Sequence, residues 1–174
     1  MNRDGVPRVV AAVARSIALS LLVAVSISVV QATEIAGVVV GVTDGDTVKV
    51  LDKRKVLHKI RLAGIDAPEK RMRYGQRAKQ RLSDMVYRRS VIVVARNKDR
   101  YGRTIGKIVV DGRDANLAMI EAGLAWHYKR YSKQQSPGDR IRYAQAETNA
   151  RRQGVGLWAQ PQPTPPWEWR AKRR

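Results

Sequence analysis

Three strand-like segments follow one another between residues 35 and 62, and this succession constrains the fold more than any other feature. Apolar and β-branched residues run through segments 35–42, 46–51 and 55–62. Asp44-Gly45 is a two-residue hairpin signal between the first two segments, and residues 52–54 form the next turn. Three antiparallel strands joined by short turns form a meander, so we expect each strand to pair with the next.

A helix and two more strands are predicted after this meander. The helix covers residues 74–89, and its apolar face carries Ala78, Leu82, Met85 and Val86. The strands cover 91–95 and 104–110, with Tyr101-Gly102 at the turn between them. This brings the number of predicted strands to five.

Two further helices are predicted in the second half of the chain. One starts near Asp114 or Asn116 and ends at Gly123. The other spans 139–153 and is closed by Gly154. Five strands, with one helix after the third and others after the fifth, is the order of an α+β, mainly β fold. We expect a five-stranded OB-fold Greek-key barrel with three helices.

The two ends of the chain differ from this central domain of residues 33–159. Residues 1–32 have the layout of a secretory signal, because arginines precede an apolar run over 17–30 that ends with Val30-Gln31-Ala32. We expect cleavage after Ala32 and a secreted or periplasmic protein; a buried helix or a retained membrane anchor are the alternatives. At the other end, residues 160–174 are rich in Pro, Trp and Arg and predict an extended, mobile tail.

The charge of the chain indicates a polyanionic partner. Lys and Arg number 34 against 15 Asp and Glu, giving a net charge of +19. Residues 1–32 hold three Arg and one Asp, so +17 remains on the rest. Nucleic acid is the commonest such partner, and a membrane surface or acidic polysaccharide remain alternatives. The absence of cysteine excludes disulfides, thiolate metal sites and cysteine nucleophiles.

Carboxylates at two strand ends suggest a site for a hard metal ion. Asp46 starts the second predicted strand and Asp66 follows the third, so the two could converge on one side of the sheet. Two carboxylates, a backbone carbonyl and waters suit Ca²⁺ or Mg²⁺. Asp46 could instead be only a turn residue, and the pair Asp66 and Glu69 could be a helix cap.

Two arginines could complete such a site. Arg61 lies between the apolar Ile60 and Leu62, so its side chain points to the opposite face of the strand. Arg103 closes the turn between the last two predicted strands. Positioned guanidiniums stabilise the charge that builds up when a phosphodiester is cleaved. A solvated arginine on an outer face and an exposed turn are the alternative interpretations.

Several short motifs, taken in order, resemble the staphylococcal nuclease family. They span about residues 35 to 158. The matching pieces are Asp44-Gly45-Asp46-Thr47-Val48, Arg61-Leu62, Ile65-Asp66-Ala67-Pro68-Glu69, Tyr74-Gly75, Asp99-Arg100-Tyr101-Gly102-Arg103, Gly123-Leu124-Ala125 and Gly156-Leu157-Trp158.

The resemblance implies an OB-fold barrel that hydrolyses DNA and RNA with Ca²⁺. By motif position, Asp46 and Asp66 would bind Ca²⁺ through their carboxylates and Ala67 through its backbone carbonyl. Glu69 would act as the general base. In the same family pattern, Arg61 and Arg103 would hold the phosphate and stabilise the transition state.

The resemblance also implies residues that contact the substrate. Arg100 and Tyr101 match the family's nucleotide pocket, and Tyr128 and Tyr131 follow the second helix, where the family has base-stacking tyrosines. We expect a monomer acting on single-stranded or locally opened DNA and RNA. The alternatives are a non-catalytic OB-fold module that binds nucleic acid or another polyanion, and an envelope protein whose tail binds acidic lipid or polymer.

Overall fold

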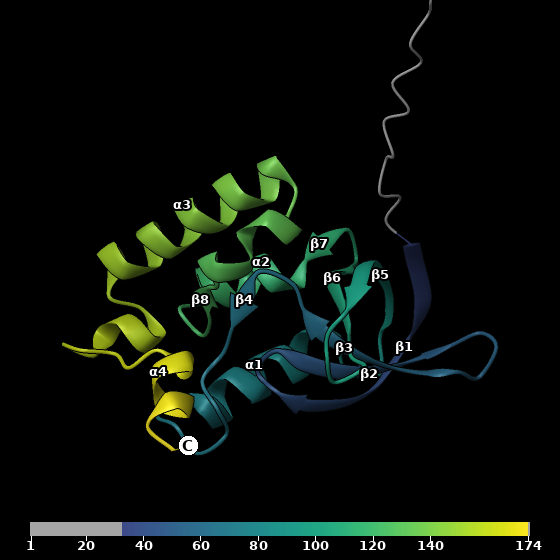
Figure 1. Ribbon diagram of the computed structural model, residues 1–174, viewed down its shortest axis with the longest axis horizontal. Coiled ribbons are helices and arrows are strands. Elements are labelled where there is room, and N and C mark those ends of the chain that lie inside the picture. Colours follow the sequence, from purple (N-terminus) through teal and green to yellow (C-terminus); the bar gives the residue numbers. More distant parts are fainter. Residues whose placement is uncertain (1–32, 174) are drawn as a thin grey trace, which may run out of the picture.

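Five long strands close into a barrel in the computed structural model, which describes residues 33–173 (Figure 1). They are β1 (Thr33–Asp44), β2 (Thr47–Asp52), β3 (Leu57–Leu62), β5 (Ser90–Lys98) and β6 (Thr104–Val110). Neighbours in the order β3-β2-β1-β5-β6 pair antiparallel, and a parallel pairing of β3 with β6 closes the barrel. The predicted five-stranded OB-type barrel is confirmed.

The closing pair of strands brings distant parts of the chain together. Ile60 of β3 is opposite Thr104 of β6, and Arg61 is opposite Ile105. Arg103, which directly precedes β6, therefore lies near Arg61 although 42 positions separate them in sequence. Three two-residue strands complete the β structure: β4 (Ile65–Asp66), which pairs with β8 (Trp126–His127), and β7 (Arg113–Asp114).

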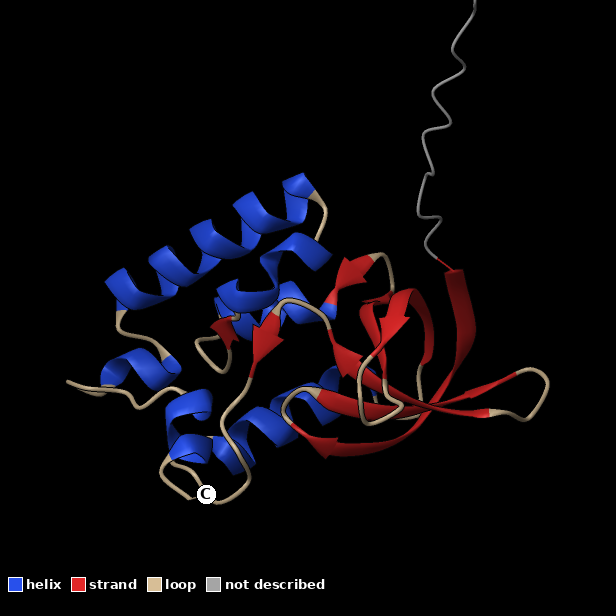
Figure 2. Cartoon of the chain, viewed as in Figure 1, coloured by secondary structure: helices blue, strands red, loops and turns tan. Residues whose placement is uncertain are grey.

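The three expected helices are present and lie together on one side of the barrel (Figure 2). They are α1 (Gly75–Val86), α2 (Ala115–Glu121) and α3 (Pro137–Gln153), and two 3-10 helices, η1 (Lys129–Gln134) and η2 (Gly156–Ala159), follow α2 and α3. Asp114 caps α2 by accepting a hydrogen bond from the backbone N–H of Leu117. α3 starts two residues before the predicted position because Ser136 caps it and Pro137 suits its first turn.

The core forms where the barrel interior meets α1 and α2. Ala78, Leu82 and Val86 on the predicted apolar face of α1 are fully buried. The barrel contributes alternate side chains, including fully buried Val48 and Val50 of β2. Burial of this apolar face fixes α1 against the sheet, and with it the loop that precedes the helix.

A buried amide holds the barrel closure next to α2. Asn116 donates hydrogen bonds from its Nδ2 to the carbonyl oxygens of Ala63 and Gly106, at 3.0 and 3.2 Å. Its Oδ1 accepts from the N–H of Ile108 at 3.1 Å. The side chain thus satisfies backbone groups at the end of β3 and within β6, where strand pairing is short. The sequence indicated Asn116 only as a possible helix start.

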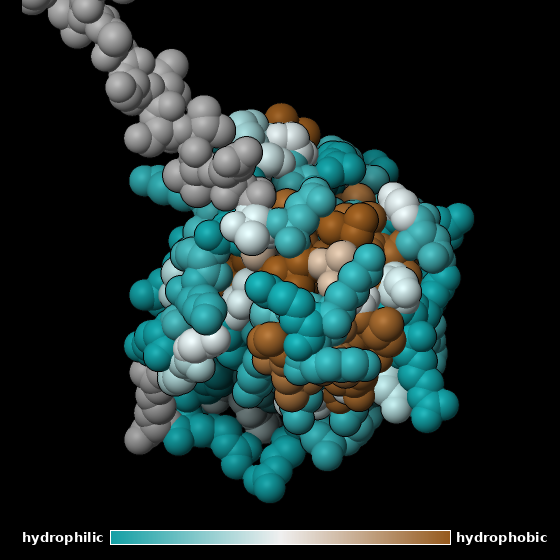
Figure 3. Space-filling view, turned by 90° about the vertical axis from the view of Figure 1, so that its right-hand side faces the viewer, coloured by the Kyte–Doolittle hydropathy of each residue, from teal (hydrophilic) through white to brown (hydrophobic). Residues whose placement is uncertain are grey.

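Exposed apolar residues occur on the barrel among many charged ones. The face shown in Figure 3 carries hydrophobic side chains between hydrophilic ones. Val38 and Val40 of β1 and Ile92 of β5 are among the exposed hydrophobics. Between residues 33 and 173, every helix is too short or too polar to cross a bilayer. The predicted signal, residues 1–32, lies outside the described residues.

The prediction of an extended tail is wrong for its distal part. Residues 166–171 form a fourth helix, α4 (Pro166–Ala171), with buried Pro166 in its first turn. α4 lies beside the loop that follows β4 (Figure 1). Composition suggested an extended, mobile segment, but α4 packs against the domain through aromatic and ionic contacts.

Candidate active site

Two glycines allow the loops of the candidate site to approach closely. A Cβ atom at Gly45, in the turn between β1 and β2, would lie 2.8 Å from Cβ of Ala67 and 2.7 Å from Cβ of Ala78. At Gly75, which opens α1, it would lie 2.0 Å from the carbonyl oxygen of Glu69. Residues without a side chain at these positions let the β1–β2 turn, the loop after β4 and α1 meet.

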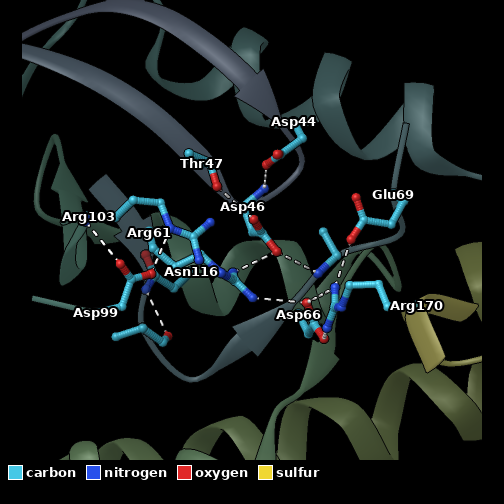
Figure 4. Close-up of polar contacts among 12 residues, drawn as sticks. Asp44, Asp46, Thr47, Arg61, Asp66, Glu69, Asp99, Arg103, Asn116 and Arg170 are labelled. Carbon is cyan, nitrogen blue, oxygen red and sulfur yellow. Dashed lines mark hydrogen bonds and ion pairs between the residues drawn. The ribbon is translucent and has the colours of Figure 1, made fainter. Parts of the chain in front are cut away.

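Arg61 lies between two carboxylates at the centre of this region (Figure 4). Its Nη1 is 2.6 Å from Oδ2 of Asp46, and its Nη2 donates to Oδ1 of Asp66 at 2.9 Å. The side chain of Asp66 is 0% exposed, and that of Arg61 only 14%. The predicted convergence of Asp46 and Asp66 is therefore present, with a guanidinium holding their negative charges together.

Asp46 is also held by polar groups of the surrounding turns. Its Oδ2 accepts a hydrogen bond from the backbone N–H of Ala67 at 3.0 Å, and its Oδ1 accepts from the hydroxyl of Thr47 at 3.0 Å. Asp44 accepts from the N–H of Asp46 at 3.1 Å. Burial, together with the negative charge of Asp46, raises the pKa of Asp44 to about 7. This end of the barrel thus concentrates negative charge that a cation would relieve.

Replacing Asp44 by Asn is expected to stabilise the metal-free protein above pH 7 more than at pH 5. In the folded state the carboxyl titrates near 7, against 3.8 for its ordinary value. The folded state therefore keeps a proton that the unfolded state loses, and stability declines as the pH rises through this range. Chemical denaturation of both proteins in EDTA from pH 5 to 8 measures the effect. A stability difference that stays constant over this range would contradict it.

Glu69 and Asp66 share a second guanidinium, which comes from α4. Arg170 donates from Nη1 to Oε1 of Glu69 at 2.7 Å and from Nη2 to Oδ2 of Asp66 at 2.6 Å. A third, longer contact joins its Nη1 to Oδ1 of Asp66 at 3.3 Å. These charged hydrogen bonds raise the pKa of Arg170 above its ordinary value despite burial, which acts in the opposite direction.

Arg103 lies on the other side of Arg61, held by the turn before β6. Its Nε donates to Oδ2 of Asp99 at 2.7 Å, and its backbone N–H donates to Oδ1 of the same residue. Although burial disfavours the charged form of Asp99, the donors of Arg103 and the N–H of Tyr101 lower its pKa. Arg100 and Arg103 both lie against the ring of Tyr101, which is 67% exposed.

Aromatic residues line the side of the site formed by η1 and α4. Tyr128 and Tyr131 meet edge to face, with ring centroids 5.2 Å apart. Trp167 of α4 stacks on Tyr128 at 5.2 Å with an interplanar angle of 16°. Trp167 also meets Trp126 edge to face at 6.3 Å. The two tyrosines expected to stack on bases therefore belong to an aromatic cluster that includes the C-terminal helix.

One cavity of about 920 Å³ joins these groups. Among the sequence-predicted residues it is lined by Asp46, Arg61, Ala67, Glu69, Arg100, Tyr101, Arg103, Tyr128 and Tyr131. Asp66 lies beneath the surface, with its side chain fully buried. The structure thus brings the whole predicted set to one place, while the role of each residue stays a prediction. A cavity of this size with guanidiniums and exposed rings can accommodate a nucleotide.

The donor set at Asp46 and Asp66 fits a hard divalent cation. The carboxylate of Asp66 is buried, and its ion-pair partners, Arg61 and Arg170, are both positively charged. Within residues 33–173, groups of three or more His, Cys, Asp or Glu side chains arranged around one point are absent. An ion here would need backbone carbonyl or water oxygens beside the two carboxylates, as Ca²⁺ commonly accepts.

Several residues of the site, among them Asp44, Asp99, Trp167 and Arg170, were not predicted from the sequence. Asp44 appeared within the Asp44-Gly45-Asp46 motif, where its turn-forming role was sufficient explanation. Trp167 and Arg170 fell within a segment interpreted from composition alone. The sequence Pro165-Pro166-Trp167-Glu168 does carry a signal, because proline in the first turn followed by an acidic residue is typical of a helix start.

Comparisons with known proteins give matches over most of the domain. Residues 59–160 match the profile of the family described as "Staphylococcal nuclease homologue". A protein of Haemophilus influenzae named "Uncharacterized endonuclease" is 43% identical over 136 residues, covering 78% of this chain and 73% of that protein. The "Micrococcal nuclease" of Shigella flexneri is 39% identical over 162 residues, covering 88% and 90%. "Protein ParB" of Escherichia coli is 42% identical over 147 residues, covering 79% and 80%.

Proposed function

The chain belongs to the staphylococcal nuclease family, and from this premise we propose that it hydrolyses both DNA and RNA, with Ca²⁺ as cofactor and low sequence specificity. The observation that carries the proposal is the contact of Arg61 with Asp46 and Asp66, beside Glu69 and Arg103 in one cavity. A binding module would need the positive charge alone. A buried pair of carboxylates within a basic surface is costly unless a cation or a reaction uses it.

Each residue has a role that follows from its chemistry. Glu69 accepts a proton from the attacking water, since its side chain is 39% exposed and borders the cavity. Arg61 and Arg103 bind the nonbridging oxygens of the phosphate as charge builds up on them. Asp46, Asp66 and the carbonyl of Ala67 would hold a divalent ion, which would supply additional positive charge at the phosphate.

The lining of the cavity explains why sequence specificity would be low. Tyr101, Tyr128 and Tyr131 offer aromatic surfaces, on which any base can stack. Arginines contact phosphates, which are the same in every sequence. Stacking requires bases that are free of their partners, so single-stranded or locally opened nucleic acid is the preferred substrate in this proposal.

A nuclease assay with three substrates tests the proposal. The purified protein is expected to degrade single-stranded DNA, duplex DNA and RNA in Ca²⁺, and to lose this activity in EDTA. Single-stranded DNA should be cut faster than duplex DNA. Full activity in EDTA would refute the requirement for a metal, and cleavage of only one fixed sequence would refute low specificity.

The main alternative is a non-catalytic module that binds nucleic acid. It predicts tight binding that weakens with salt, because the chain without residues 1–32 has a net charge of +17. It also predicts no cleavage with any metal ion. The presence of Asp46, Arg61, Glu69 and Arg103 in one cavity, with Asp66 buried against Arg61, favours the enzyme. We further propose a monomer that is secreted or periplasmic after cleavage near Ala32, which sequencing the N-terminus of the mature protein would test.

A further inference from the structure

The C-terminal helix α4 places a positive charge at the carboxylates that the proposed metal site would use. We propose that α4 is a built-in competitor of the divalent ion, with Arg170 taking the place of a cation at Asp66 and Glu69. This inference rests on the proposed function, because it takes Asp66 as a metal ligand and Glu69 as the general base.

The burial of Asp66 shows that a guanidinium must move before an ion can bind. Its side chain is 0% exposed and is contacted by Arg61 and by Arg170. Arg61 is anchored in β3 and also bridges to Asp46. The side chain of Arg170 is 39% exposed and belongs to a six-residue helix near the end of the chain. Arg170 is therefore the group that can leave at lower cost.

The contacts that hold α4 are few enough to be displaced. A helix of six residues is marginal by itself, so its docking depends on tertiary contacts. These include the bonds of Arg170, the burial of Pro166, the stacking of Trp167 on Tyr128 and its edge-to-face contact with Trp126. The stacking also covers a ring that a nucleobase would use. α4 thus blocks the position of the ion with Arg170 and one base-stacking surface with Trp167.

Competition between α4 and the ion is reciprocal. If docking of Arg170 weakens Ca²⁺ binding, Ca²⁺ must weaken the docking of α4 by the same factor. Two independent measurements follow, one of ion affinity in variants of α4 and one of the mobility of α4 as the ion is added. Neither requires the protein to cleave nucleic acid.

The first measurement compares Arg170→Met with Lys172→Met in a calorimetric titration with Ca²⁺. Methionine keeps an unbranched stem and removes the charge in both variants. Lys172 lies at the C-cap of the same helix and is exposed, so its replacement controls for the loss of one positive charge. Arg170→Met should bind Ca²⁺ more tightly than wild type, within the range of roughly 5- to 150-fold usual for coupled sites. Lys172→Met should resemble wild type.

The second measurement follows the backbone of residues 160–173 by hydrogen exchange. Exchange should accelerate when Ca²⁺ is added to the wild-type protein, because the ion releases α4. Trp167→Ala, which retains Arg170 but removes the stacking on Tyr128, should also bind Ca²⁺ more tightly than wild type. This variant keeps the proposal testable if Arg170→Met folds poorly.

Equal or weaker Ca²⁺ binding by folded Arg170→Met, compared with Lys172→Met, would overturn the inference. Weaker binding would instead make Arg170 a residue that positions Asp66 and Glu69 for the ion. Absence of Ca²⁺ binding in wild type and every variant would overturn both the inference and the proposed cofactor. Tighter binding in Arg170→Met by a protein that cleaves no nucleic acid would support the inference and refute the proposed function.

Discussion

Replacement of Glu69 by Gln is expected to reduce nuclease activity by about 10²- to 10⁴-fold, the usual contribution of a general base. The amide has nearly the size of the carboxylate but cannot take a proton from the attacking water. Steady-state cleavage of single-stranded DNA in saturating Ca²⁺ measures the loss. The loss should appear in kcat, because Glu69 acts on the water and contributes little to substrate binding.

The fold of this variant should be close to that of wild type. Glu69 is 39% exposed and forms a salt bridge with the half-exposed Arg170, so loss of this bridge costs about 0–1 kcal/mol of stability. Glu121→Gln, at the end of α2, makes the same chemical change at an exposed position away from the cavity and should retain full activity. Unchanged turnover in Glu69→Gln would remove Glu69 from its proposed role.

Replacement of Arg61 by Met is expected to be the most destabilising change in the site. It removes the guanidinium between Asp46 and Asp66, so that the mostly buried Asp46 loses its ion pair while Asp66 keeps Arg170. Breaking a buried charge pair in this way costs about 3–5 kcal/mol. Denaturant unfolding in EDTA measures the free energy of unfolding, and the activity of the variant should fall with the loss of a phosphate ligand.

Added Ca²⁺ should restore part of the lost stability, because an ion that binds only the folded state stabilises it by mass action. Lys59→Met serves as the control, since Lys59 is exposed on the same strand and should change stability by at most about 0.5 kcal/mol. An unchanged free energy of unfolding in Arg61→Met would show that the contacts of Arg61 with the carboxylates have no net value in the metal-free protein.

The barrel and its site could be predicted because local patterns carried the required information. Alternating apolar residues fixed the positions of Val48 and Val50 inside the barrel. The same alternation placed the side chain of Arg61 on the face of β3 that Ile60 and Leu62 do not occupy. Short turn signals set which strands pair. The motifs then located Asp46 next to β2, Asp66 after β3 and Glu69 in the following loop, where the loops of the structure meet.

Contacts between distant segments could not be read from such patterns. The bonds of Arg170 to Glu69 and Asp66 span about a hundred positions, and composition alone made the tail seem unpaired. The hydrogen bonds of Asn116 to distant backbone groups could not be predicted either. An amide before an apolar run signals a helix start whether or not its side chain has tertiary partners. The raised pKa of Asp44 depends on burial, which emerges only after the chain has folded.

The parallel pairing of β3 with β6 also makes the assembly of the candidate site a late step of folding. Arg61 and Arg103 reach the same cavity only after this pair closes, and all residues from β1 to β6 must be in place for that. Such non-local pairing is slow to form compared with hairpins and helices. A nascent or partly folded chain therefore lacks an assembled active centre. The candidate site is therefore a property of the closed barrel, and no single hairpin or helix of the chain holds it.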